Sequence, residues 1–330
     1  MSKKRQKQST DDMITHITKN LNSKLKRVEV DTKNTNEYGI KFEELDENMK
    51  ISLMFNEMFF SMFANSNHME YSARFLSLFL KIDYEYLLAN LRLSNSVLNK
   101  EKVITKAQRC DYVAELGNIN FNIEVNVNNT RETLERNISY AHKLFMKKVK
   151  VGSKYEFSYA VQLNINNFSF IGNNKIVDTF FICNDQGDIL SDKLIFIQIY
   201  APNLRKAWYT KEELSESERF LLSLIETNIE EANKIGMDDE YMTKAIEKQI
   251  ELGHEDELLE SYNHELAAYE QFKIDGYNEG FESGVAEGHA SGLEEGQAKI
   301  IKSLLDSGMA KEQISEITKI SLEDIEKIAS

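Results

Sequence analysis

The sequence has few of the residues that interrupt or cross-link a chain. Of its 330 residues, one is proline and two are cysteine, Cys110 and Cys183. Two cysteines cannot build a framework of disulfides, so both are expected to be reduced thiols of a cytoplasmic protein. Neither a CxxC nor an HxxxH spacing occurs, and this argues against a zinc site made of cysteine and histidine.

Long apolar runs are also missing. The most apolar stretch, residues 51–80, is interrupted by charged and amide side chains, and no run of 18 apolar residues exists. A membrane span is therefore excluded. The first five residues are basic, but no apolar segment follows them, so no secretory signal is expected. The glycine patterns of a P-loop and of a dinucleotide-binding turn are absent.

Charge is distributed unevenly along the chain. The net charge is -14, with +5 in residues 1–210 and -19 in residues 211–330. Eight basic residues precede Val30, and we interpret residues 1–45 as a basic mobile arm that is either simply solvated or in contact with phosphate. The acidic half would repel nucleic acid, so it is expected to form solvated helices or to contact other proteins.

Hydrophobic spacing predicts an α/β domain. Methionine and phenylalanine recur at helical spacing between residues 54 and 79, with a break at 64–67, which predicts two core helices. Residues 118–128 alternate strictly between apolar and polar, which is typical of a half-buried strand, and residues 108–116 can pair with them through a Gly117–Asn118 turn. A helix near 130–148 and strands near 157–165, 179–183 and 194–201 complete a mixed sheet flanked by helices.

The C-terminal part is predicted to be helical and to self-associate. Six glycines recur at every fourth position from Gly276 to Gly296. Each costs about 1 kcal/mol relative to alanine in a helix, so a long helix here requires close packing with another copy or element. We therefore expect a homo-oligomer. The predicted organisation is a basic arm (1–45), the α/β domain (46–210), an acidic helical region (211–275), the glycine-spaced helix (276–298) and a small helical end (299–330).

Three side chains on the predicted hairpin could hold a metal. Alternation places Glu124 and Asn126 on one face of their strand, and Asp111 lies on the partner strand. Two carboxylates on adjacent strands can share a hard cation such as Mg²⁺ or Mn²⁺, and the carbonyl of Val125 could be a further ligand. Such a cation lowers the pKa of bound water and stabilises charge on a phosphate that is being cut.

These residues carry a resemblance to a known family. A strand with Asp111, a turn, a strand reading Glu124-x-Asn126 and then a helix resemble the PD-(D/E)XK nuclease superfamily. More specifically, the chain resembles its recombination-promoting nuclease family of transposases. Further similarities are the stretch 56–63, the helix segment 136–145, and the glycine repeat with its small helical end. Together they cover about residues 56–328.

The resemblance implies a function and roles for the residues. It implies a Mg²⁺-dependent DNA endonuclease with DNA as its partner, in which Asp111 and Glu124 bind the metal and Asn126 orients water or phosphate. Arg131 and Arg136 on the following helix are candidate phosphate contacts, although the neighbouring glutamates also fit ordinary pairing on a helix surface.

The sequence also departs from the family pattern. Asn56 stands in place of the opening aspartate, Phe60 in place of a lysine four residues later, and Asn126 in place of the glutamine of Glu-x-Gln. No ammonium group therefore lies at the position where many members of the superfamily hold the attacking water. The alternative is a catalytically degraded nuclease fold that acts as an oligomeric interaction protein. Binding of a divalent metal distinguishes the two.

Overall fold

The computed structural model describes residues 37–94, 97–98, 108–109, 111–128, 132–147, 157–169 and 174–329. Most of the predicted basic arm lies outside these residues. The chain forms two compact units. The first ends at His264 and the second begins at Glu265, inside the helix α10 (Asp256–Asp306).

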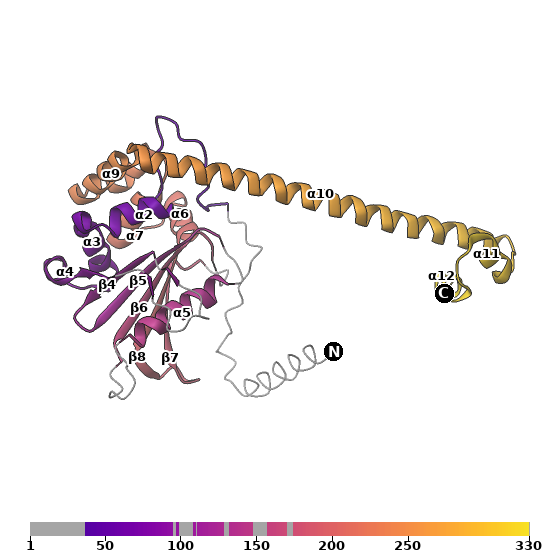
Figure 1. Ribbon diagram of the computed structural model, residues 1–330, viewed down its shortest axis with the longest axis horizontal. Helices are drawn as coiled ribbons and strands as arrows, with labels where there is room; N and C mark the ends of the chain where they lie inside the picture. Colours follow the sequence, from indigo (N-terminus) through magenta and orange to yellow (C-terminus); the bar gives the residue numbers. More distant parts are fainter. Residues whose placement is uncertain are drawn as a thin grey trace. The chain divides into compact units, whose positions relative to one another are not determined.

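A mixed sheet forms the centre of the first unit (Figure 1), as the sequence predicts, and it has six strands where five are expected. Its spatial order is β1-β4-β5-β6-β8-β7. The strands β5, β6 and β8 are parallel, whereas β1, β4 and β7 are antiparallel to their neighbours. The strands are β1 (Arg92–Leu93), β4 (Tyr112–Leu116), β5 (Ile119–Asn126), β6 (Tyr159–Asn166), β7 (Val177–Cys183) and β8 (Ile189–Tyr200).

The predicted hairpin is only partly correct. Tyr112–Leu116 pairs with β5 through a turn in which Gly117 has a φ of 60°. Gln108–Arg109 instead forms β3, which pairs with β2 (Val97–Leu98) in a separate two-stranded sheet. Asp111 lies between β3 and β4 in the sequence. Its backbone N–H donates to the side chain of Glu124 on β5 instead of to a backbone carbonyl of that strand. The ladder therefore stops at Tyr112, and the predicted strand is divided.

Helix α5 (Thr133–Phe145) covers one face of the sheet, within the predicted range 130–148. Its Tyr140 and Leu144 pack against Val113 of β4 and Ala160 of β6 in one apolar cluster. Figure 1 shows this helix beside the strands, while α2, α3, α7 and α9 gather at one end of the sheet. The position of α5 matters for function, because it follows directly after the strand that carries Glu124.

The remaining helices of the first unit form a second apolar core. The predicted pair of helices is confirmed, with a short 3₁₀ turn at Ser66–His68 between them. The first of these two helices packs against residues 240–253 and the second against residues 216–225 of the acidic half, and Leu53 N–H bonds to the carbonyl of Leu224. Residues 216–253 are therefore built into the same core. The helices are α2 (Asn56–Phe63), α3 (Met69–Leu80), α4 (Tyr84–Asn90), α6 (Ala201–Tyr209), α7 (Glu216–Ile225), α8 (Ile229–Gly236) and α9 (Glu240–Gly253).

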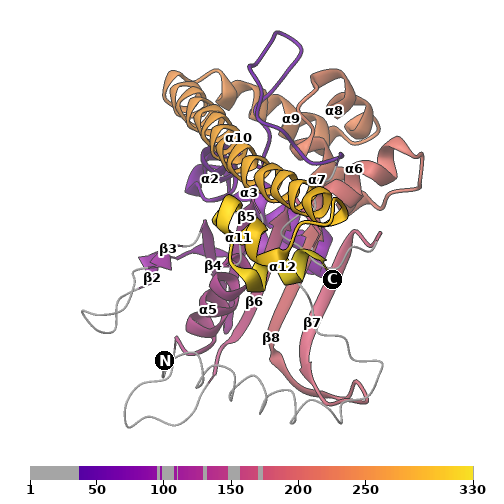
Figure 2. The same ribbon diagram turned by 90° about the vertical axis from the view of Figure 1, so that its right-hand side faces the viewer.

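The second unit has a small core of its own. After α10 ends, α11 (Lys311–Thr318) and α12 (Leu322–Ala329) fold back against its last turns (Figure 2). Ile301, Ile314 and Ile325 are buried together in the cluster that results. Gly308 has a φ of 87° at the first turn, and the Ser321 hydroxyl accepts the Asp324 N–H at the start of α12. None of the described helices is long and apolar enough to cross a membrane.

Candidate active site

Asp111 and Glu124 lie next to each other at the edge of the β4–β5 pair. The last paired residues are Tyr112 and Ile123. Asp111 immediately precedes Tyr112, the first residue of β4, and Glu124 is the residue of β5 that follows Ile123. The backbone N–H of Asp111 donates to Glu124 Oε1 at 3.1 Å, and the N–H of Val125 donates to Asp111 Oδ2 at 3.0 Å. The structure therefore brings the two predicted carboxylates together.

The backbone of Val125 faces the same place. In a β-strand the N–H and C=O of one residue point toward the same neighbouring strand. Because the N–H of Val125 points toward Asp111, its carbonyl also lies on the β4 side, beyond the last ladder pair. The carboxylates of Asp111 and Glu124 and the carbonyl oxygen of Val125 thus lie together where β4 begins.

Glu124 is almost completely buried, with 2% of its surface exposed. Burial and then the neighbouring Asp111 carboxylate raise the pKa of Glu124 well above its ordinary value, to about 8. Hydrogen bonds from Asn122 and from the Asp111 backbone, and the positive charge of Arg136, act in the opposite direction. A carboxyl group in such surroundings gains strongly from a cation beside it.

The polar face of β5 is buried rather than solvated, which corrects the prediction of a half-buried strand. Parallel strands are usually covered on both faces, and here α5 covers the polar one. The amides of β5 find partners on β6: Asn122 Nδ2 donates to Gln162 Oε1 and Asn126 Nδ2 donates to Asn166 Oδ1, both at 2.9 Å. Amides can replace water here because each both donates and accepts.

Asn126 connects the strand to Arg136. Its Oδ1 accepts a hydrogen bond of 2.8 Å from Arg136 Nη2 on α5. Asn126 is 2% exposed, whereas Arg136 is an exposed residue. The structure thus joins two of the residues that the sequence singled out. Arg131, the other candidate phosphate contact, lies outside the described residues.

The opening motif lies on helix α2. Asn56, Glu57 and Phe60 are all exposed there, while the intervening Met58 and Phe59 are buried. Helix α2 packs against α3 and α9. Within the described part of the chain, no cluster of three or more His, Cys, Asp or Glu side chains could hold a metal ion.

The donor atoms fit a magnesium-like ion. Mg²⁺ is commonly held by one or two carboxylates and completes its shell with water and substrate phosphate. Asp111 and Glu124 provide such a pair, and Val125 provides a backbone oxygen on the same side. A hard cation also suits these ligands because all of them are oxygens.

Sequence reasoning missed the amides that surround this pair. Asn122 donates to both Glu124 Oε1 and Gln162 Oε1, and Asn166 donates to Gln198 Oε1 of β8 at 2.9 Å. A signal was present, since Gln162, Asn164 and Asn166 alternate along β6 as the amides of β5 do. Two adjacent strands with alternating amides predict a shared polar layer.

A mixed sheet in which an aspartate just before one strand lies beside a glutamate of the next strand, followed by a covering helix, defines a PD-(D/E)XK nuclease-like protein. Comparison with known families agrees: the profile described as PD-(D/E)XK nuclease family transposase matches residues 56–275. The chain belongs to this family. No curated protein and no solved structure matches it.

Proposed function

We propose that the protein is a metal-dependent DNA endonuclease of the recombination-promoting type, with Mg²⁺ or Mn²⁺ as its cofactor. The observation that carries the proposal is the pair of hydrogen bonds that ties Asp111 to Glu124 and Val125. These contacts hold two carboxylates, one of them almost completely buried, close to each other. Such an arrangement is costly for folding and is typical of functional sites.

The proposed reaction is hydrolysis of a phosphodiester. A water oxygen forms a bond to phosphorus, one ester P–O bond breaks, and the departing oxygen takes up a proton. A bound divalent ion would lower the pKa of the water and stabilise the charge on the phosphate. Asp111, Glu124 and the carbonyl of Val125 would hold the ion, and Asn126 would orient water or phosphate through its amide.

Nicking of supercoiled plasmid tests the proposal. We expect the full-length chain to nick plasmid with Mg²⁺ or Mn²⁺ and to lose this activity with excess EDTA. Asp111→Asn and Glu124→Gln should each be inactive. Glu135→Gln is the matched control, because Glu135 is an exposed carboxylate on α5. Cleavage by either site variant at the wild-type rate would refute the assignment.

The second candidate is an oligomeric interaction protein that retains the nuclease fold without cleaving. It is supported by the separate core of the second unit, beside which Ile317 and Leu322 are 65% and 45% exposed. Titration calorimetry with Mn²⁺ separates the two functions. The endonuclease requires metal binding that Glu124→Gln removes, whereas the interaction protein requires none.

A further inference from the structure

Three buried amides form a relay that ends on Arg136. Asn166 Nδ2 donates to Gln198 Oε1, Asn126 Nδ2 donates to Asn166 Oδ1, and Arg136 Nη2 donates to Asn126 Oδ1. In each of these three hydrogen bonds an N–H group faces an oxygen atom. Turning any one amide over would place two oxygens or two N–H groups against each other. The relay therefore fixes the carbonyl oxygen of Asn126 toward α5.

This orientation determines what Asn126 can do. Its oxygen accepts from Arg136 and one of its N–H groups is used by Asn166. A buried amide that is held on both sides is suited to fixing a neighbour rather than to moving during a reaction. The neighbour is a guanidinium group, whose planar fork of five N–H donors matches the oxygens of a phosphate.

Arg136 is accessible from solvent, because as a whole it is an exposed residue. Its Nη2 atom donates to Asn126, and only 2% of Asn126 is exposed. Its charge also acts on the site, because it is one of the influences that lower the pKa of Glu124. The cation is thus anchored on one side, open on the other, and electrostatically close to the carboxylate pair.

From these contacts we infer that Arg136 binds a phosphate oxygen of the nucleic acid beside the carboxylates, and that Asn126, Asn166 and Gln198 are positioning residues for it. The third residue of the Glu-x-Asn element, Asn126, is then itself uncharged. The positive charge at this place is the guanidinium of Arg136 on α5, which Asn126 holds by a hydrogen bond. This inference rests on the proposed function and specifies how the same site receives its substrate.

Binding of duplex DNA, measured without cleavage, tests the inference. The full-length chain is titrated against a fluorescent oligonucleotide duplex in Ca²⁺ at several salt concentrations. Loss of one phosphate contact reduces the slope of log K against log salt by about 1. We expect Arg136→Met to show this reduction with about tenfold weaker binding, and Arg136→Lys to retain the slope.

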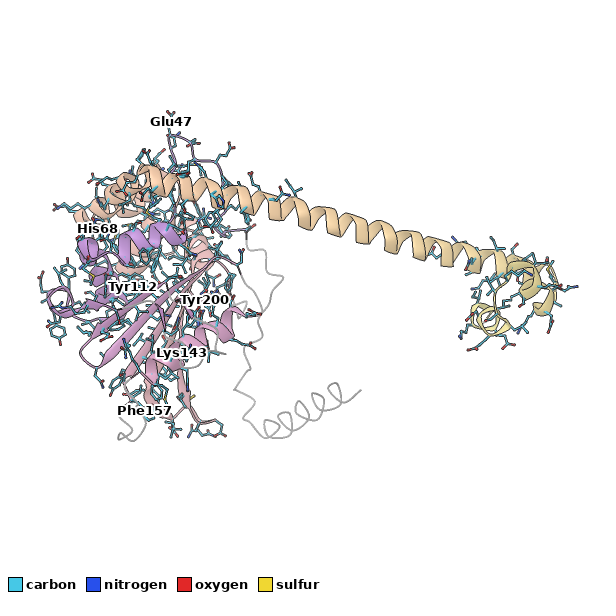
Figure 3. All side chains as sticks on the ribbon, in the orientation of Figure 1. Glu47, His68, Tyr112, Lys143, Phe157 and Tyr200 are labelled. Atoms are coloured by element: carbon cyan, nitrogen blue, oxygen red, sulfur yellow. The ribbon has the colours of Figure 1, made fainter. Side chains whose placement is uncertain are left out.

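Lys143 provides a matched control on the same helix (Figure 3). It lies seven residues after Arg136, which is two turns and about 10 Å further along nearly the same face. Lys143→Met removes an equal charge and should leave the slope unchanged. An unchanged slope in Arg136→Met, or an equal reduction in both variants, would overturn the inference. Absence of DNA binding by the wild-type chain would instead refute the proposed function.

A double-mutant cycle tests the relay. Asn166→Leu breaks the middle contact and should weaken DNA binding when Arg136 is present, but should have no further effect in Arg136→Met. Equal effects in both backgrounds would show that Asn166 does not act through Arg136. Because Arg136 is exposed, its variants are expected to fold even if the buried Asn166→Leu chain does not, and the slope measurement then decides alone.

Discussion

Lys50 gives a quantitative prediction about stability. Only 3% of this residue is exposed, and its Nζ donates to the carbonyl of Leu224 at 3.2 Å and to Gln249 Oε1 at 2.7 Å. Burial lowers the pKa of Lys50 from 10.5 to about 7, although the negative charge of Glu226 acts in the opposite direction. At about 1.4 kcal/mol per pH unit, keeping this lysine charged in the folded chain costs roughly 5 kcal/mol.

The sign of the pH dependence follows from the two protonation states. The unfolded chain keeps the Lys50 proton up to about pH 10.5, whereas the folded chain releases it above about pH 7. The unfolded state therefore binds more protons between these values, and stability rises with pH across that window. From pH 7 to pH 9, the free energy of unfolding of the wild type should increase by roughly 2 kcal/mol relative to Lys50→Met.

Urea denaturation followed by circular dichroism at pH 6, 7, 8 and 9 measures this difference. Lys50→Met also loses two hydrogen bonds, but that loss does not depend on pH and shifts all four values equally. Lys41→Met is the control, because Lys41 is an exposed lysine of the same segment. If the difference between wild type and Lys50→Met is constant from pH 6 to pH 9, Lys50 is not buried in its neutral form and the reasoning fails.

Further predictions concern the site and the second unit. Glu124→Gln and Asp111→Asn should each abolish plasmid cleavage. The melting temperature of Glu124→Gln should stay at or above that of the wild type, since burial favours a neutral side chain there. A large decrease in this melting temperature would show that Glu124 has a structural role. The full-length chain should sediment as an oligomer in analytical ultracentrifugation and a chain without residues 272–330 as a smaller assembly, and sedimentation of both chains as monomers would refute self-association. Removal of residues 265–330, with a net charge of -8, should tighten DNA binding at low salt, and weaker binding would contradict a repulsive role.

The sequence predicts the elements of the site better than their surroundings. Strict alternation in 118–128 is sufficient to place a strand there, because only period-two spacing puts Phe121, Ile123 and Val125 on one face. The same alternation is equally compatible with a polar face in water. Its burial depends on α5 and on the amides of β6, which are 40 residues away in sequence, so local spacing could not reveal it.

Two further differences have local causes. The predicted strand 108–116 breaks because Asp111 uses its backbone and its carboxylate in contacts with Glu124 and Val125. Those contacts involve side chains, which hydrophobic spacing does not encode. The acidic half contributes helices to the first core because Phe220 and Leu224 are buried there, although net charge alone favoured a separate solvated region.

The amide pairs between β5 and β6 also have a consequence for folding specificity. Two apolar parallel strands can shift past each other by two residues without exposing any side chain, because the alternation repeats every two positions. Such a misaligned pair would be almost as stable as the correct one. In this chain Asn122 faces Gln162 and Asn126 faces Asn166 in the native alignment.

A two-residue shift in either direction isolates one of these amides. In one direction Asn122 comes to face Ala160, and in the other Asn126 comes to face Phe168. A buried amide that loses its partner costs about 1–3 kcal/mol. The polar layer beneath α5 thus penalises both misalignments of β5 against β6, and only the native one of these three alignments pairs both Asn122 and Asn126 with an amide of β6.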